Sequence, residues 1–232
     1  MKVRIKFSKT GVIKFIGHLD LMRFFQKAFR RTDIKVRYSG GFSPHMIMSF
    51  AQALGVGVES KGEYFDVELE DGQDIFDLVE ELNRQMVEGI EVISYKVLPE
   101  KTTNAMASVA AASYEIDFYN GNPFSEKTID TYNAAPELLY TKTTKSGDNT
   151  FNIKDFVFAI GYMDKGVSFT IDASSAGNIK PRYLLETLAG IEGIDLSKHP
   201  YHVMRMDLLL RKEDGTLAPL DDIDEQDSSS QA

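Results

Sequence analysis

Three residues near the start of the chain could do acid–base or metal chemistry: His18, Asp20 and His45. Imidazole titrates near neutral pH and carboxylates accept protons, so a His-His-Asp cluster would suit a metal ion or general acid–base catalysis. The cluster needs His18, at the start of a predicted helix, and His45, after a glycine-rich loop, to lie at the same end of a sheet. Otherwise His18 and Asp20 satisfy the exposed N–H groups of the first helical turn.

The position of the second strand decides between these alternatives. If residues 34–38 form it, the loop before His45 emerges beside His18 and the groups converge. If residues 46–50 form it, the loop enters at the opposite end and the two histidines are far apart. The sequence holds no complete catalytic set, no Walker or dinucleotide motif and no nucleophile elbow. We therefore predict no catalytic residue beyond these weak candidates, no metal ion and no cofactor.

Periodicity predicts the elements that carry these residues. Val3, Ile5 and Phe7 alternate with Lys2, Arg4 and Lys6, which is typical of a strand with one buried face. Residues 17–31 have helical spacing, with apolar residues on one stripe. A second stripe of this helix is cationic and is formed by Arg23, Lys27, Arg30 and Arg31.

The order of predicted elements is β-α-β-β-α-β, and it is repeated after residue 111. We predict an α+β chain of two tandem ferredoxin-like (split βαβ) units with mostly antiparallel sheets. The predicted boundaries are a first domain at 1–99, a linker at 100–111, a second domain at 112–212 and a disordered acidic tail at 213–232. Low apolar content and many carboxylates indicate disorder in that tail.

Charge is distributed unevenly along the chain. The first fifty residues carry eleven Lys and Arg against two Asp, a net of +9, and the other 182 carry fifteen against thirty-three, a net of −18. A basic segment on an acidic body is typical of an electrostatic footprint for phosphate-rich partners. Arg4 and Lys6 lie on the sheet face opposite the helices, and they pair with carboxylates of the second domain if that domain covers the face. The basic region is thus predicted to dock through several faces.

The loop before His45 adds small and aromatic residues to this region. Ser39, Gly40 and Gly41 permit either an anion-binding nest or a sterically required turn. Single-stranded nucleic acids stack on exposed aromatic side chains, for which Tyr64, Tyr38 and Phe42 are the candidates. The predicted binding residues are Arg4, Lys6, His18, Asp20, Arg23, Lys27, Arg30, Arg31, Arg37, Tyr38, Ser39, Gly40, Gly41, Phe42, Ser43, Pro44 and His45.

Several short motifs follow one another between residues 15 and 64: FIGHLD at 15–20, YSGGFSPH at 38–45, SFA at 49–51, GVGVES at 55–60 and GEY at 62–64. In this succession the chain resembles the radical-SAM-linked family of unknown function. The resemblance implies a bacterial companion of a radical S-adenosylmethionine protein, encoded beside it or fused to it, often near genes for a ribonuclease and large-subunit ribosomal proteins. Gly17 stands where relatives usually have Ser, so a helix cap is lost here.

Three functions are compatible with these features. The first is an accessory protein of a radical SAM enzyme that docks on RNA, such as tRNA or rRNA, or on an RNA-linked substrate. The second is an RNA-processing or RNA-modifying enzyme that uses His18, Asp20 and His45, because tandem ferredoxin-like units also resemble CRISPR repeat-cleaving endoribonucleases. The third is a purely structural protein–protein adaptor.

Composition also sets the expected compartment. The chain has no cysteine, which excludes disulfides and thiolate metal sites. No window is apolar enough for a membrane span, and the first residues lack the apolar core of a signal peptide. We therefore expect a cytoplasmic protein that does not contact membranes.

Overall fold

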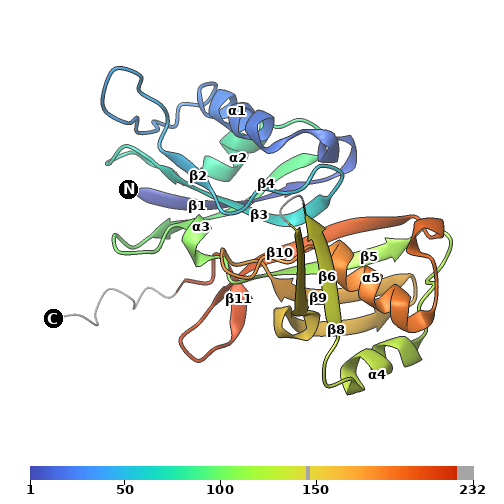
Figure 1. The fold of residues 1–232 in the computed structure, drawn as a ribbon. Helices are drawn as coiled ribbons and strands as arrows, with labels where there is room; N and C mark the ends of the chain where they lie inside the picture. The colour runs from blue at the N-terminus through green and yellow to red at the C-terminus, as the bar shows by residue number, and fades with distance from the viewer. Residues whose placement is uncertain (145–146, 224–232) are drawn as a thin grey trace. The chain divides into compact units, whose positions relative to one another are not determined.

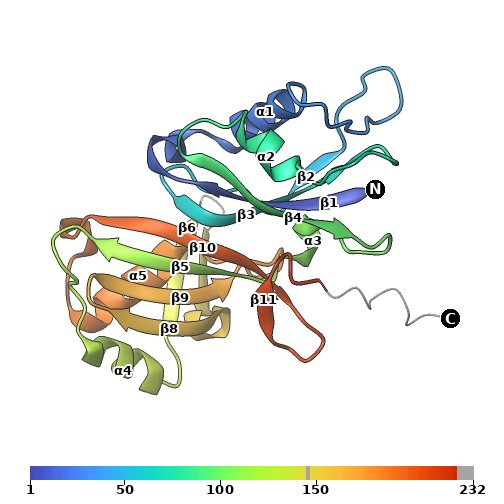
Figure 2. The same cartoon turned by 180° about the vertical axis from the view of Figure 1, so that it is seen from behind.

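The computed structural model describes residues 1–144 and 147–223 (Figure 1 and Figure 2). The chain divides into two compact units. Met1–Val109 and the segment from Asp207 onward form unit one, and Ala110–Met206 form unit two. Antiparallel strand pairs and a few short helices build both units, so the chain is a mixed α+β protein, as predicted. The assignment of two tandem ferredoxin-like units stays a prediction.

Unit one follows the predicted order of elements. Three antiparallel pairings place β1 between β4 and β3 and place β2 against β3. The elements are β1 (Lys2–Lys9), the 3₁₀ turn η1 (Gly11–Phe15), α1 (His18–Phe29), β2 (Met48–Phe50), β3 (Glu59–Glu68), α2 (Leu78–Asn83) and β4 (Ile90–Leu98).

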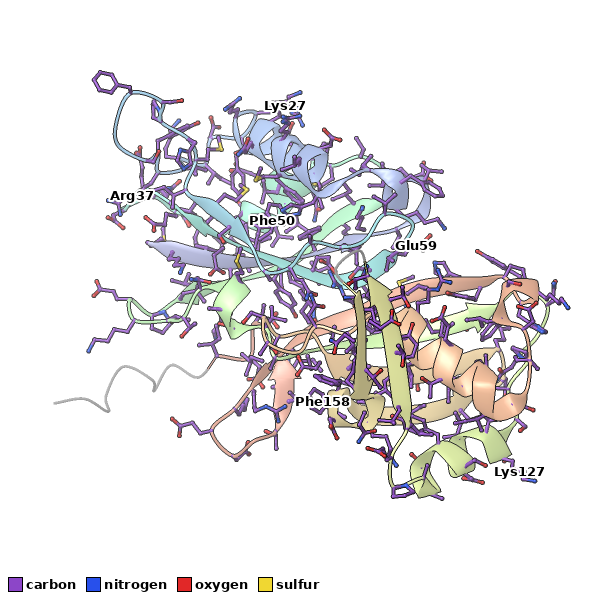
Figure 3. All side chains as sticks on the ribbon, in the orientation of Figure 1. Lys27, Arg37, Phe50, Glu59, Lys127 and Phe158 are labelled. Atoms are coloured by element: carbon purple, nitrogen blue, oxygen red, sulfur yellow. The ribbon has the colours of Figure 1, made fainter. Side chains whose placement is uncertain are left out.

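The core of unit one lies between this sheet and α1. Alternation in β1 buries Val3, Ile5 and Phe7 completely. The ring centroid of Phe25 in α1 lies 4.8 Å from that of Phe7 and 4.8 Å from that of Phe65. The centroids of Phe7 and Phe65 lie 5.8 Å apart, so the three rings form one cluster. Phe50 joins the same cluster between the sheet and α1 (Figure 3). Burying each aromatic side chain stabilises the unit by about 2 to 3 kcal/mol.

The face of the sheet opposite α1 is covered within the same unit. The contacts on this face come from Thr103 and α3 (Ala105–Ser108), from Asp207 and from Leu220. Asp207 belongs to β10 (Tyr201–Arg211), which pairs with β11 (Leu217–Pro219). Leu220 is fully buried and its N–H donates to the Leu208 carbonyl.

The compact units differ from the predicted domain boundaries in two places. Residues 100–109 are part of unit one rather than a linker, and Ala105 is fully buried there. The predicted disorder is wrong for residues 213–223, because β11 and Leu220 supply the apolar anchors that the acidic composition conceals. Residues 224–232, the rest of the predicted tail, lie outside the described residues.

Unit two repeats the alternation of strands and helices. Within it β9 pairs with both β5 and β8, always antiparallel. The prediction missed the separate hairpin of β6 and β7, whose mostly polar residues lack an apolar alternation. The elements are β5 (Ala111–Phe118), α4 (Glu126–Ala134), β6 (Leu139–Thr144), β7 (Gly147–Asn152), η2 (Ile153–Phe156), β8 (Val157–Met163), β9 (Gly166–Asp172), α5 (Pro181–Glu192), η3 (Leu196–Lys198) and residues 201–206 of β10.

Candidate nucleic-acid interface

The structure separates His45 from His18 and Asp20, the other two candidates for catalysis. β2 begins at Met48, so the loop before His45 enters the sheet at the end opposite the start of α1. The ring of His18 packs edge-on against Phe50, with centroids 5.3 Å apart. His45 lies five residues before Phe50, a separation of roughly 16 Å along an extended chain. The converging alternative is therefore not observed.

Each of the three residues has a local partner instead. Asp20 is exposed and lies 3.5 Å from the guanidinium of Arg23. His45 Nδ1 lies 2.8 Å from Ser39 Oγ, and this oxygen also accepts from the His45 backbone N–H. Within residues 1–144 and 147–223 no three His, Asp or Glu side chains are placed to hold a metal ion.

The outer face of α1 carries the predicted cationic stripe. Leu21, Phe25, Ala28 and Phe29 bury the opposite face in the core. Lys27 and Arg30 are exposed, and Lys27 points away from the sheet (Figure 3). Arg31, just past the end of the helix, is exposed and donates to the side-chain and backbone oxygens of Gln85.

The glycine-rich loop is the tip of a short ribbon. Tyr38 and Met46 form a β-bridge, and Ser39 N–H donates to the His45 carbonyl, which closes the loop at residues 39–45. Gly41 has φ +99°, a conformation that favours glycine, so the turn accounts for its presence. At the tip Phe42 is fully exposed and at the root Tyr38 is 46% exposed. An apolar ring that contacts nothing in its own fold is available to a partner.

The cationic helix face and the aromatic loop belong to one region of unit one. The loop between α1 and β2 projects beyond the C-terminal end of α1 in both views (Figure 1 and Figure 2). Residues 21–45 carry six Lys and Arg against one Asp, a net of +5. Arg37, at the root of the loop, is exposed and lies 3.8 Å from Glu68. We call this region the basic-aromatic surface; it consists of Arg23, Lys27, Arg30, Arg31, Arg37, Tyr38 and Phe42.

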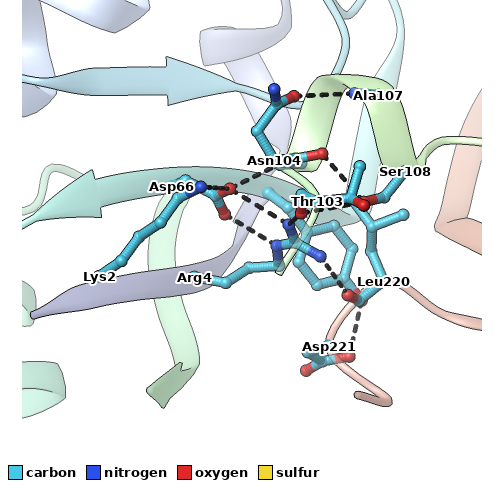
Figure 4. Close-up of polar contacts among 11 residues, drawn as sticks. Lys2, Arg4, Asp66, Thr103, Asn104, Ala107, Ser108, Leu220 and Asp221 are labelled. Atoms are coloured by element: carbon cyan, nitrogen blue, oxygen red, sulfur yellow. Dashed lines mark hydrogen bonds and ion pairs between the residues drawn. The ribbon is translucent and has the colours of Figure 1, made fainter. Parts of the chain in front are cut away.

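The sheet face opposite α1 is not the open basic face that was predicted. The Arg4 side chain is buried, and its guanidinium donates to both carboxylate oxygens of Asp66, at 2.8 and 3.1 Å (Figure 4). It also donates to the carbonyls of Leu220 and Thr103. A buried guanidinium must be paired, because desolvation of a free charge costs several kcal/mol. Arg4 is therefore a structural residue and cannot reach phosphate.

Lys6 and Tyr64 are also bound by carboxylates of unit one. Lys6 Nζ lies 2.7 Å from Asp207, and the Tyr64 hydroxyl donates to Asp207 at 2.7 Å, with Asp221 3.2 Å away. Burial, followed by the negative charge of Asp207, raises the pKa of Tyr64 far above its ordinary range. Tyr64 is fully buried, so its prediction as a stacking platform is wrong.

Sequence reasoning missed the carboxylates that neutralise this face. One signal was available for Asp66. The alternation that places Phe65 and Val67 in the core places Asp66 on the opposite face of the strand, and the β1–β3 pairing brings it opposite Arg4. Asp207 and Asp221 had no such signal, since they reach the sheet from more than 140 residues away along the chain.

Comparison with known proteins identifies a family but no activity. The model of the family described as an uncharacterized protein conserved in bacteria (DUF2344) matches residues 2–181, and the chain belongs to this family. No curated protein matches the chain. Across the described parts of the chain, every helix is too short or too polar to cross a membrane.

Proposed function

We propose that this member of the DUF2344 family binds single-stranded regions of RNA through the basic-aromatic surface and serves as an accessory protein of a radical SAM enzyme. The observation that carries the RNA proposal is the fully exposed Phe42 beside the exposed cations of α1. Single-strand binders combine these two features, because cations contact the phosphates and aromatic rings stack on the bases.

The cations that have no carboxylate partner favour the outer face of α1, rather than β1, as the RNA-binding surface of unit one. Lys2, Arg4 and Lys6 have carboxylate partners within 3.5 Å, whereas Lys27 and Arg30 have none among the described residues. Release of counterions from RNA requires cations that are free to approach phosphate. The α1 face therefore contributes more to RNA affinity than β1, although β1 has the higher density of Lys and Arg.

The radical SAM partnership rests on the motif succession between residues 15 and 64. Those motifs map onto η1, the start of α1, the 39–45 loop, β2, the turn before β3 and the first half of β3, and their exposed apolar side chains include Phe15, Leu19 and Phe42. An accessory role needs no catalytic cluster in this chain, and the separation of His18 from His45 removes the support for the enzyme alternative.

Charge reversal tests the RNA proposal. Arg23→Glu, Lys27→Glu and Arg30→Glu together should weaken binding to a single-stranded oligonucleotide and lower the slope of log K against log salt by about 2, because each lost phosphate contact removes about 0.7. The matched control is Lys127→Glu, Lys165→Glu and Lys180→Glu, which changes net charge equally on exposed sites of unit two. Equal binding by both triple variants, or no RNA binding by the wild type at low salt, would refute the proposal.

Co-purification from bacterial extract, with and without nuclease, tests the partnership. A radical SAM protein that stays bound after nuclease treatment supports a direct complex. The absence of a radical SAM protein from both purifications would contradict the accessory role. The structural adaptor would then be the next hypothesis to test.

A further inference from the structure

A cavity of about 200 Å³ lies on the sheet face of unit one at the root of the 39–45 loop. Its floor is formed by two cross-strand rows. Ser49 lies opposite Asp66 in one row, and Glu68 lies opposite Lys2 in the other. Asn104, just before α3, lines one side of the cavity, and His45 lines it at the root of the loop.

Several polar groups of this cavity have hydrogen-bonding capacity to spare. Asn104 Oδ1 accepts from the Ala107 N–H, which leaves its Nδ2 without a partner among residues 1–144 and 147–223 (Figure 4). The hydroxyl of Ser49 also has no partner within that described part of the chain. His45 uses Nδ1 for Ser39, so Nε2 is unused in the described structure.

The charges around the cavity exclude the simplest ligands. Asp66 and Glu68 on the floor repel a phosphate group, and Lys2 repels a metal cation. Each carboxylate already has a cationic neighbour, since Arg4 holds Asp66 at 2.8 Å and Arg37 lies 3.8 Å from Glu68. A neutral ligand with both donors and acceptors on its edge fits this arrangement best.

We propose that this cavity takes one unstacked nucleobase of the bound RNA. The inference rests on the proposed function, because the ribbon that carries Tyr38 and Phe42 leads directly into residues 46–49 of the cavity. The volume accommodates a single base rather than a base pair. Asn104 Nδ2 and the Lys2 ammonium donate to ring acceptors, and Glu68 accepts from an exocyclic amine or ring N–H, which is the type of edge contact that reads unpaired bases.

Nucleoside monophosphates test the cavity independently of the RNA surface. In NMR titrations of the full chain, at least one of the four ribonucleoside monophosphates should bind in the millimolar range that so small a ligand reaches, with shifts at Ser49 and Asn104. Ribose 5-phosphate, which lacks the base, should not bind. Equal binding of ribose 5-phosphate, or no binding of any monophosphate, would overturn the proposal.

Two variants separate a built site from a general effect on folding. Asn104→Asp keeps the oxygen that accepts from Ala107 and loses the Nδ2 donor, so it should retain the thermal unfolding midpoint and bind the monophosphate about tenfold more weakly. Ser49→Leu should fill the cavity and abolish binding. If both variants bind monophosphates like the wild type, the cavity is not a base site.

The same variants distinguish this inference from the proposed function. If oligonucleotides bind the wild type and both cavity variants with the same base preference, the base site is refuted and the RNA surface stands. If monophosphates bind but oligonucleotides do not, the basic-aromatic surface is refuted instead.

Discussion

Removal of the Arg4 guanidinium should destabilise unit one strongly and leave RNA affinity unchanged. Arg4→Met keeps most of the side-chain volume but deletes four hydrogen bonds, two to Asp66 and one each to the carbonyls of Leu220 and Thr103. The Asp66 carboxylate is 3% exposed. After the change its remaining partners among residues 1–144 and 147–223 are the Ala105 N–H at 2.7 Å and the Lys2 ammonium at 3.5 Å.

The magnitude follows from the charge that is left behind. An uncompensated buried carboxylate costs about 3 to 5 kcal/mol. Lys2 is partly exposed and offsets only a small part of this penalty. We therefore expect the free energy of unfolding to fall by about 3 to 4 kcal/mol.

Urea unfolding followed by circular dichroism measures this loss, and hydrogen exchange at the Ala105 amide locates it. The second variant, Arg4→Met with Asp66→Leu, removes both charges and should recover most of the stability, because a buried ion pair replaced by apolar residues is often neutral. Arg23→Met is the control, since the pair of Arg23 and Asp20 is exposed and contributes less than about 1 kcal/mol. A loss below about 1 kcal/mol for Arg4→Met, together with weaker RNA binding, would show that Arg4 is a surface cation and refute the reasoning.

Three further predictions concern other residues. Phe42→Ala should lower affinity for single-stranded RNA by about fivefold to a hundredfold, as for the loss of one stacked base, with no change in the unfolding midpoint because the ring is fully exposed. The free energy of unfolding should fall by about 1.4 kcal/mol per pH unit above about pH 10. The reason is that the raised pKa of Tyr64 keeps its proton bound in the folded chain, whereas the unfolded chain releases it near the ordinary value of 10.0. Tyr64→Phe should remove this part of the pH dependence of the free energy of unfolding. Gly166→Ala should destabilise unit two by more than about 3 kcal/mol, because the added Cβ would lie 1.8 Å from the Ile116 carbonyl oxygen. Gly190→Ala in α5 should instead stabilise unit two by about 0.5 to 1 kcal/mol, because no neighbouring side chain or other segment lies within 4 Å of the added Cβ. Thermal unfolding measures the sign of both changes.

Local patterns were sufficient to predict the strands and helices of unit one from β1 to β4. The alternation of Val3, Ile5 and Phe7 with charged residues placed β1 and its two faces, and the apolar stripe within residues 17–31 placed α1. These signals are local because side-chain direction repeats with the period of the element. The β6–β7 hairpin has no such repeat, so it became visible only in the structure.

The contacts that decide the site are not local. Parity placed Arg4 correctly on the face opposite α1, but the Leu220 carbonyl that it contacts is 216 residues away. A segment with many carboxylates is indistinguishable from a solvated tail until its few apolar residues, here Leu220 and Ala218, are seen to be buried. The position of His45 likewise depended on whether residues 34–38 or residues 46–50 form the strand beside β3. The sequence pattern of each segment allowed this pairing, and β2 of the structure lies in the second segment.

The number of Lys and Arg in the first fifty residues is therefore not a measure of nucleic-acid affinity. Lys2, Arg4, Lys6 and Lys14 lie within 3.5 Å of Asp66, Asp207 or Glu59, so four of the eleven cations balance internal carboxylates. The Lys6–Asp207 pair and the hydrogen bonds from Arg4 to the Leu220 carbonyl and from the Ala105 N–H to Asp66 hold residues 207–221 and α3 against the sheet, and Arg4 and Tyr64 are buried there. The charge that remains is concentrated on α1 and at the root of the 39–45 loop, beside the exposed rings of Tyr38 and Phe42. Under the proposed function, the phosphates of RNA lie on that side, because the fold has already neutralised the cations of β1.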